Sequence, residues 1–389
     1  MAVAALTEEV KRLACRAGFD YCGITRPELS ERDVAALRRW LAAGMHADME
    51  WMAEPVRLAR RSDPASMLAD VQSVIMVAMR YTPPQPVIGG RVVVDGARGV
   101  IASYALGDDY HTVMKRRLKR LARELDQLLG RHDQRLFVDT APVLEHALAA
   151  SSGVGWQGKH SLTLNRHGGS WMLLGSLFTT ARLHADSPSS HHCGSCRSCI
   201  DICPTAAIVA PFVVDAKRCI SWLTIEYGGV IPRALRPLMG QHIFGCDLCQ
   251  SVCPWNGKQE PVDCDLLRPR MENSRPLLQE MLTLDQEEFH LRFRATPVKR
   301  SGRVRLVRNS CVAAGNSGDV RLVPYLIALL ADSSCLIRLH AVWALVQLRN
   351  VECDSMVEAA FTTLQVNERD QRVLNEITVV RSGGLNYDN

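Results

Sequence analysis

The stretch Cys193-Gly-Ser-Cys196-Arg-Ser-Cys199-Ile-Asp-Ile-Cys203-Pro204 decides the fold of this chain. Three cysteines at two-residue gaps, followed by a fourth at a three-residue gap and a proline, show the spacing of bacterial ferredoxins. In that arrangement three thiolates point into one cubane, and the fourth ligates the neighbouring cluster. A second run, Cys246-Asp-Leu-Cys249-Gln-Ser-Val-Cys253-Pro254, completes the pattern together with Cys219. The two runs therefore predict two 4Fe-4S clusters.

The eight cysteines divide into two predicted ligand sets. One set is Cys193, Cys196, Cys199 and Cys253, and the other is Cys203, Cys219, Cys246 and Cys249. The segment between Ile220 and Gly245 must loop out and return, so we expect it to be available for other contacts. Four-cysteine sets also form structural zinc sites, but zinc ribbons use pairs of cysteines separated by a long spacer. Two clusters in one small module indicate a relay of single electrons to another acceptor.

Length and composition indicate a folded, multidomain protein without a membrane segment. The 389 residues suit two or three domains, and 47% are hydrophobic. Six of the fourteen cysteines lie outside the cluster sets among apolar neighbours, which indicates buried thiols in a reducing cytoplasm. No apolar run reaches the roughly 18 residues of a membrane span, and acidic residues follow the N-terminus too closely for a signal peptide. We therefore expect a cytoplasmic protein.

The first 180 residues mix helix and strand signals without a strict βαβ rhythm, which predicts an α+β fold. Apolar spacing predicts helices over 6–18, 31–43, 110–130 and 143–152, and strands over 21–24, 71–79, 100–104 and 136–138. Residues 161–165 and 171–179 are predicted to pair as a hairpin. The helix from Tyr110 has a basic face that we interpret as solvated. Glycines at 153–158 do not form a nucleotide fingerprint, because no strand precedes them.

The C-terminal part shows a weak repeat at a thirty-residue offset. Arg308-Asn-Ser-Cys-Val312-Ala-Ala314 matches Arg338-Leu-His-Ala-Val342-Trp-Ala344, which predicts stacked helical hairpins of the HEAT kind. A basic strip precedes and enters this repeat, and its members are Arg292, Arg294, Lys299, Arg300, Arg303, Arg305 and Arg308. Such a strip is typical either of a phosphate-binding surface or of a solvated linker. We predict domains at 1–180 (α+β), 181–270 (clusters) and 271–389 (helical repeat).

Several longer segments together resemble one family. They are Ala105-Leu-Gly-Asp-Asp-Tyr-His111, Val138-Asp-Thr-Ala-Pro-Val-Leu-Glu145, Gly155-Trp-Gln-Gly-Lys-His-Ser161, Arg218-Cys-Ile-Ser-Trp-Leu-Thr-Ile-Glu226 and Gly315-Asn-Ser-Gly318. With both cysteine runs, they make the chain resemble the epoxyqueuosine reductases over essentially its whole length. The resemblance implies reduction of epoxyqueuosine to queuosine at the wobble position of tRNA. It also implies a cobalamin in the N-terminal domain that receives electrons from the two clusters.

The resemblance also implies partners and rival functions. We expect tRNA as the substrate, an external electron donor of the flavodoxin or ferredoxin type, and a monomeric enzyme. A first alternative is a cobalamin-dependent reductive dehalogenase, although such proteins are commonly exported and this chain shows no export signal. A second alternative is a non-catalytic electron-transfer or tRNA-binding protein, which would need no acid at the active site.

The resemblance further assigns individual residues. Asp139 matches the family's proton donor, although an aspartate at a strand end also serves well as a helix cap. The positions implied at the cobalamin are Arg61, Ala102, Asp139, Gly158, Lys159, His160 and Ser221. Among these, Ala102 departs from the family, because many relatives have arginine where this chain has Ala102-Ser103.

Overall fold

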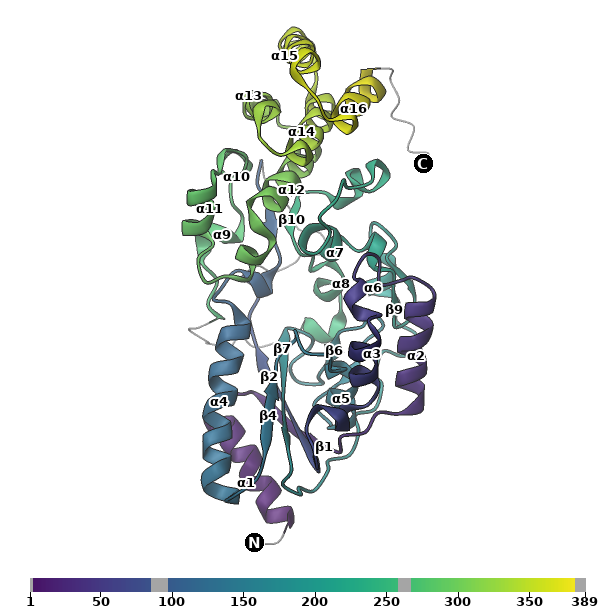
Figure 1. Cartoon of the computed structure of the whole chain (residues 1–389), viewed down its shortest axis with the longest axis vertical. Helices are drawn as coiled ribbons and strands as arrows, with labels where there is room; N and C mark the ends of the chain where they lie inside the picture. The colour runs from purple at the N-terminus through teal and green to yellow at the C-terminus, as the bar shows by residue number, and fades with distance from the viewer. Residues whose placement is uncertain (1–2, 85–96, 258–266, 382–389) are drawn as a thin grey trace. The chain divides into compact units, whose positions relative to one another are not determined.

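A computed structural model describes residues 3–84, 97–257 and 267–381 of the chain. The chain forms two compact units, each assembled from separate stretches of sequence (Figure 1). The first unit comprises Met1–Gly90, Gly107–Lys217 and Leu248–Arg268, and the second comprises Arg91–Leu106, Arg218–Asp247 and Pro269–Asn389. None of the helices in the described ranges is both long enough and apolar enough to cross a bilayer.

The first unit is built on a four-stranded antiparallel sheet. Its strands, in spatial order, are β1 (Tyr21–Thr25), β2 (Ser73–Arg80), β7 (Met172–Thr179) and β4 (Gln134–Phe137). The register of the central pair places Ser73 opposite Thr179 and Arg80 opposite Met172. The strands predicted at 21–24, 71–79, 136–138 and 171–179 are confirmed within two residues at each end. Apolar, β-branched runs thus formed strands where the sequence indicated them.

The predicted hairpin between 161–165 and 171–179 is wrong. The short strand β6 (Thr163–Leu164) pairs instead with β5 (Trp156–Gln157), while β7 pairs on its two edges with β2 and β4. The eight residues of β7 are buried along nearly their whole length, so both edges of the strand need partners. Those partners lie far away in the sequence, and local spacing could not identify them.

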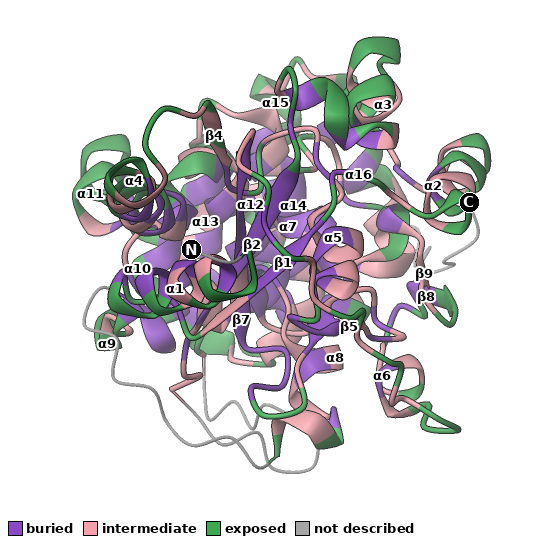
Figure 2. Cartoon of the chain, turned by 90° about the horizontal axis from the view of Figure 1, so that it is seen from below, coloured by how far each residue is buried: buried purple, intermediate pink, exposed green. Residues whose placement is uncertain are grey.

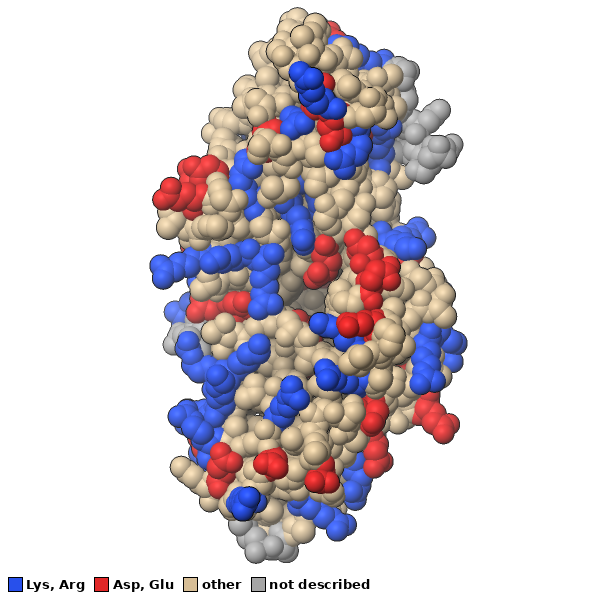
Figure 3. All heavy atoms as spheres, viewed as in Figure 1, with Lys and Arg blue, Asp and Glu red and all other residues tan. Residues whose placement is uncertain are grey.

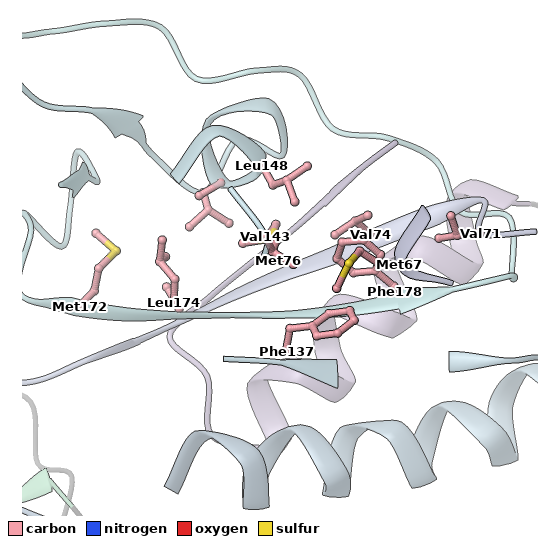
Figure 4. Packing of buried hydrophobic residues seen from close by; sticks show 13 residues of the cluster. Met67, Val71, Val74, Met76, Phe137, Val143, Leu148, Met172, Leu174 and Phe178 are labelled. Carbon is pink, nitrogen blue, oxygen red and sulfur yellow. The ribbon is translucent and has the colours of Figure 1, made fainter. Parts of the chain in front are cut away.

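Three helices of this unit pack on the sheet, namely α1 (Val3–Arg16), α4 (Tyr110–Leu129) and α5 (Glu145–Ser151). The unit also contains α2 (Glu31–Ala42), α3 (Pro55–Ser62), α6 (Ser198–Asp201) and α8 (Leu248–Ser251). Figure 4 shows Val74, Met76 and Phe178 on the face toward α5, where Leu148 joins the same apolar cluster. On the opposite face α4 lies so close that a side chain at Gly175 would come within 2.9 Å of Met114. The predicted helices at 6–18, 31–43, 110–130 and 143–152 are confirmed within three residues.

The second unit is mainly helical. Its elements are α7 (Ile220–Ile225), α9 (Met271–Ser274), α10 (Leu278–Thr283), α11 (Gln286–Arg292), α12 (Gly302–Ser317), α13 (Val323–Ala328), α14 (Cys335–Leu348), α15 (Asp354–Asn367) and α16 (Gln371–Arg381), with a parallel pair β3 (Val100–Ile101) and β10 (His242–Phe244). The strand predicted at 100–104 is shorter than expected. Both segments matched at the thirty-residue offset are helical, and α12 packs against α14. Figure 2 shows that both helices are largely buried.

The spacer between the two cysteine runs is held by buried polar contacts within the second unit. The Asn309 side chain donates to the carbonyls of Thr224 (2.9 Å) and Ile243 (2.8 Å). Arg236, which is buried, forms an ion pair of 2.7 Å with Glu376 of α16. The spacer was expected to make contacts beyond the clusters, and these contacts go to the C-terminal helices.

Candidate functional site

Asp139 lies in the loop that leads from β4 to α5 and has an unusual backbone conformation. Its φ of 54° falls in the left-handed region, which a residue with a side chain adopts infrequently and Asp tolerates better than most. The backbone N–H of Asp139 donates to both carboxylate oxygens of Glu145, at 3.2 Å each. The Asp139 side chain is 57% exposed. The loop therefore presents this carboxylate outward while Glu145 holds its backbone in place.

His111 connects Asp139 to a second carboxylate. Its Nε2 lies 3.0 Å from Asp139 Oδ2, and its Nδ1 lies 2.8 Å from Asp109 Oδ1. Asp109 also caps the N-terminus of α4 by accepting from the His111 N–H. Each of the two short contacts needs a hydrogen, whereas a neutral imidazole has one donor and one acceptor. A neutral His111 can donate to only one of the two carboxylates, so hydrogen bonds at both contacts require a further proton on the array.

Glu145 adds another carboxyl with a shifted pKa. Burial raises the pKa of Glu145 from 4.5 to about 8, and the nearby charge of Asp139 adds to this rise. The N–H of Asp139 and the His111 ring act in the opposite direction without cancelling it. A carboxyl with this pKa is largely protonated near neutral pH. The site therefore stores protons at Glu145 as well as around His111.

Replacing Glu145 by Gln tests this shifted pKa through the pH dependence of stability. The folded state binds the Glu145 proton more tightly than the unfolded state does, so the wild-type protein loses stability as the pH rises from 4.5 to about 8. Gln cannot ionise and can still accept from the Asp139 N–H. We therefore expect Glu145→Gln to become progressively more stable than the wild type across this window. Melting temperatures at about pH 5 and about pH 8 measure the change, and an equal difference at both values would contradict the raised pKa.

The turn around Gly158 presents a second buried histidine. The Leu162 N–H donates to His160 Nδ1 at 3.2 Å, so Nε2 carries the proton of the neutral ring. Burial lowers the pKa of His160 to about 4, with a further contribution from His146. Nε2 is buried and has no hydrogen-bond partner in the described part of the chain. A buried donor in this state fits a ligand that offers an acceptor.

Gly158 and Lys159 shape this turn. A side chain at Gly158 would lie 2.8 Å from both His160 Cε1 and Leu164 Cδ1, so the turn has no room for one. Lys159 Nζ donates to the carbonyls of Gly194 (2.7 Å) and Cys196 (2.8 Å). The ammonium group therefore binds the loop of the first cysteine run. A cofactor at this turn would contact the backbone of Gly158 and Lys159 and not the Lys159 ammonium group.

Arg61 of α3 offers a further unsatisfied donor. The side chain is buried, its guanidinium lies 5.1 Å from the Trp51 ring centroid, and Nη1 has no hydrogen-bond partner among the described residues. Burial lowers its pKa, and the neighbouring Arg57 contributes to the same change. A buried guanidinium is stable only when its donors are satisfied, so a polar or anionic ligand fits here. Ala102 and Ser221, which the resemblance also implied, belong to the second unit.

The cysteines of the first predicted set share the first unit. Burial raises the pKa of Cys253 to about 11; the Trp255 N–H opposes this rise, and the other three thiols of the set, Cys193, Cys199 and Cys196, add to it. Cys253 also packs in one cluster with Trp156 and Leu164, against which Cys193 lies. The helices α6 and α8, which contain Cys199 and Cys249, also pack together. Of the second set, Cys203 and Cys249 belong to the first unit, and Cys219 and Cys246 to the second.

The basic strip does not form one exposed surface. Arg308 is buried and donates to the carbonyls of Leu223 (2.7 Å), Tyr227 (2.8 Å) and Gly229 (2.8 Å), so its prediction as a tRNA contact is wrong. Three further members also bind within the second unit: Arg292 pairs with Glu280, Arg303 with Asp332, and Arg305 donates to the Ile225 carbonyl. Arg294, Lys299 and Arg300 are exposed. Charge alone predicted the strip, whereas partners distant in sequence decide which cations face solvent.

Replacing Arg308 by Met should destabilise the protein. Each buried carbonyl left without a donor costs about 1–3 kcal/mol, and removal of a buried cation offsets part of this cost, so we expect a loss of roughly 2–4 kcal/mol. Thermal unfolding of Arg308→Met measures the loss, and Arg294→Met serves as the exposed control. Full stability of Arg308→Met together with weakened RNA binding would restore Arg308 as an RNA contact.

The paired cysteine runs and the proton-holding carboxyl groups define an iron-sulfur oxidoreductase. Residues 192–256 match the 4Fe-4S double cluster binding domain, and residues 61–140 match the domain described as epoxyqueuosine reductase QueG, DUF1730. An epoxyqueuosine reductase of Xanthomonas campestris pv. campestris is 43% identical over 339 residues, covering 87% of this chain and 95% of that protein. The chain therefore belongs to the epoxyqueuosine reductase family, whose members carry 4Fe-4S clusters and cobalamin.

Two solved structures of the family share the fold. One is an epoxyqueuosine reductase with a tRNA-Tyr epoxyqueuosine-modified stem loop, with a TM-score of 0.87 and 27% identity over 97% of this chain and 99% of that one. The other is the Bacillus subtilis enzyme, with a TM-score of 0.87 and 28% identity over 97% and 98% of the two chains. In the Bacillus structure an aspartate catalytic loop is swung out of the active site.

Asp109, His111 and Glu145 were not predicted as functional residues from the sequence. The sequence did contain an indication of their importance, because His111 ends one of the segments that carry the family resemblance and Glu145 ends another. His111 and Asp139 are 28 residues apart in the chain, and only the fold shows that their side chains meet.

Proposed function

We propose that this chain reduces epoxyqueuosine to queuosine at the wobble position of tRNA, with Asp139 as the proton donor. The observation that supports this proposal is the array of Asp109, His111 and Asp139, in which His111 links the exposed Asp139 carboxyl to the carboxyl of Asp109. The catalytic aspartate loop described for the Bacillus enzyme agrees with an exposed aspartate on a loop.

Reduction of the epoxide requires protons, and the array of Asp109, His111 and Asp139 can supply them. Converting the epoxide to an alkene removes its oxygen as water, which consumes two electrons and two protons. Asp139 delivers the first proton to the departing oxygen, and His111 replaces it through its 3.0 Å contact with Asp139. Glu145, whose pKa is about 8, supports the loop and is the nearest further store of a proton.

Cobalamin, when bound, supplies the low-potential metal centre that receives electrons from the clusters. Arg61 Nη1 and His160 Nε2 are buried donors without partners in the described ranges, and they would satisfy amide or phosphate oxygens of such a cofactor. The tight turn at Gly158 and Lys159 would line it with backbone. Ala102 and Ser221 complete the proposed contacts; Ala102 itself supplies only a methyl group where many relatives have arginine.

The clusters relay electrons from an external donor of the flavodoxin or ferredoxin type. We propose Cys193, Cys196, Cys199 and Cys253 for one cluster, and Cys203, Cys219, Cys246 and Cys249 for the other. The packing of Cys193 beside Cys253, and the place of all four cysteines in one unit, support the first set. Because the first set needs Cys253 of the second run, and the second set needs Cys203 of the first run as well as Cys219, neither run could hold a cluster alone.

We further propose a domain plan of 1–180, 181–270 and 271–389, with a HEAT-like repeat at the C-terminus. Arg308 of α12 and Arg338 of α14, which match at the thirty-residue offset, both anchor their helix to a neighbouring segment. Arg294, Lys299 and Arg300 are the exposed members of the basic strip and the proposed tRNA contacts in this region. We expect the enzyme to act as a monomer in the cytoplasm.

Expression in a bacterial strain that lacks its own epoxyqueuosine reductase tests the proposed function. Nucleosides from the digested tRNA should contain queuosine when this chain is expressed and epoxyqueuosine when it is not. If epoxyqueuosine persists although the purified chain holds its clusters and cobalamin, the proposal fails. Reduction of aryl halides by that protein would then favour the dehalogenase alternative, and absence of any turnover would favour the electron-transfer or tRNA-binding alternative.

A further inference from the structure

The helix α4 (Tyr110–Leu129) has a row of exposed cations that the function described so far does not use. Lys115, Lys119 and Arg123 follow one another at four-residue intervals, and Arg116 lies beside them; all four side chains are exposed. Residues four apart lie on the same face of a helix. We call these four residues the basic face of α4. The apolar residues Val113, Leu118, Leu121 and Leu125 are buried on the opposite side.

The cations of this face have no counter-charges in the described structure. Lys115, Arg116, Lys119 and Arg123 form no ion pair or side-chain hydrogen bond with another described residue, whereas Arg120 is paired with Glu124 at 3.0 Å. The neighbouring helix α1 has its arginines paired, because Arg12 and Arg16 both bind Glu9. The acidic residues of α4, Glu124 and Asp126, come after Arg123. Four adjacent uncompensated cations repel one another, and an anionic partner would remove that repulsion.

The surface here is also hollowed. Arg116, Lys119, Ala122 and Arg123 line an open groove of about 440 Å³. Figure 3 shows Lys and Arg side chains gathered over the part of the surface where Figure 1 places α4. A groove with cationic walls and one small residue can admit a phosphate backbone between the side chains.

The position of α4 connects this face to the candidate active site. His111, in the first turn of α4, contacts Asp139, and the helix then leads away from that contact. With a rise of about 1.5 Å per residue, Lys115 lies roughly 6 Å and Arg123 roughly 18 Å farther along the axis than His111. An RNA strand whose modified nucleotide reaches Asp139 can therefore continue along this row.

We propose that the basic face of α4 binds phosphate groups of the RNA whose modified nucleotide occupies the site at Asp139. This inference rests on the proposed function and adds an RNA-binding surface to it. An acidic electron-transfer protein is the other anionic partner that charge alone would allow. Such a protein must approach the clusters, and Figures 1 and 2 both place α6 and α8 on the other side of this unit from α4. The geometry therefore favours RNA.

The triple variant Lys115→Gln, Lys119→Gln, Arg123→Gln tests this surface in the full-length protein with its cofactors. Each phosphate contact contributes about 0.7–0.9 to the slope of log affinity against log salt, so we expect the slope to fall by roughly two. We also expect an epoxyqueuosine-modified anticodon stem loop to bind at least about tenfold more weakly at low salt. Iron content and melting temperature, measured on the same samples, establish that the variant is folded and loaded.

A control variant with the same change in net charge distinguishes two causes of weaker RNA binding. One cause is the loss of contacts on α4, and the other is the lower net charge of the whole protein. Arg32, Arg38 and Arg39 are exposed on α2, and their simultaneous replacement by Gln removes the same three charges. The inference predicts a near wild-type salt slope for this control. An equal loss in both triple variants would overturn it, because net charge alone would then explain the binding.

The remaining outcomes separate this inference from the proposed function. If the wild-type protein reduces the RNA but the α4 variant keeps its affinity and salt slope, the surface proposal is wrong and the function stands. If the α4 variant instead slows reduction of the clusters by flavodoxin while RNA affinity stays constant, the face binds the electron donor and the RNA proposal is overturned. If the loaded wild-type protein leaves epoxyqueuosine unchanged, the proposed function fails, and the salt slopes still decide whether the face binds RNA.

Discussion

Asp139→Asn should lower turnover on epoxyqueuosine-modified tRNA by about a hundredfold to ten-thousandfold, the usual effect of losing a positioned proton donor. Asn has nearly the same shape and tolerates the left-handed backbone at this position, where φ is 54°. It can still contact His111, but its amide cannot release a proton to the departing oxygen. The chain should therefore fold, hold its clusters and bind RNA while reacting slowly.

Asp70→Asn is a matched control for this variant. Asp70 is exposed and also has a positive φ, of 55°, yet it lies in the loop before β2 rather than between β4 and α5. Single-turnover rates with both variants under the same reductant measure the effect. If Asp139→Asn reacts as fast as Asp70→Asn, the proton comes from another group, and Glu145 is the next candidate because its pKa is about 8.

Cys253→Ala should remove one whole cluster and abolish turnover. A protein with two 4Fe-4S clusters binds about eight iron atoms, and loss of one ligand set should leave about four. The lost cluster should be the one held by the first run, although Cys253 lies in the second run, because Cys253 packs with Cys193 of the first run. Electrons then have no complete path to the acceptor.

Cys15→Ala is the control for this change, since Cys15 is a thiol on α1 outside both sets; it is exposed, so the prediction of a buried thiol was wrong for this residue. Iron and acid-labile sulfide analysis after anaerobic purification should give about eight irons for the control and about four for Cys253→Ala. Retention of both clusters by Cys253→Ala, or selective loss of the cluster that contains Cys219, would contradict the ligand assignment.

Cysteine spacing and apolar periodicity predicted the features that depend on neighbouring residues in the sequence, namely the cluster ligands and most helices and strands. The cysteine spacing indicated the clusters because seven of the eight predicted ligands lie in two short runs, each of which ends in Cys-Pro. The apolar run at 71–79 indicated a buried strand, and β2 occupies Ser73–Arg80. The helix from Tyr110 and its end near Gly130 likewise follow from apolar spacing and a glycine with φ of 70°.

Spacing and periodicity could not predict contacts between segments that are far apart in the sequence. Arg308 was grouped with exposed arginines, because the carbonyls that bind it, at Leu223, Tyr227 and Gly229, lie about eighty residues earlier in the chain. The hairpin prediction failed because strand pairing depends on which edges are left free in the folded sheet. Asp139 was identified through family resemblance alone, and its contact with His111 required the fold.

The most direct test of the account is a single-turnover reaction of the purified, anaerobic protein with an epoxyqueuosine-modified anticodon stem loop and excess reductant. The protein must first be shown to hold about eight irons and bound cobalamin. Mass analysis of the released nucleosides then reports whether one oxygen atom has been lost. The account predicts queuosine from the wild-type protein and almost entirely epoxyqueuosine from Asp139→Asn in the same time. Unchanged epoxyqueuosine from fully loaded wild-type protein would contradict it.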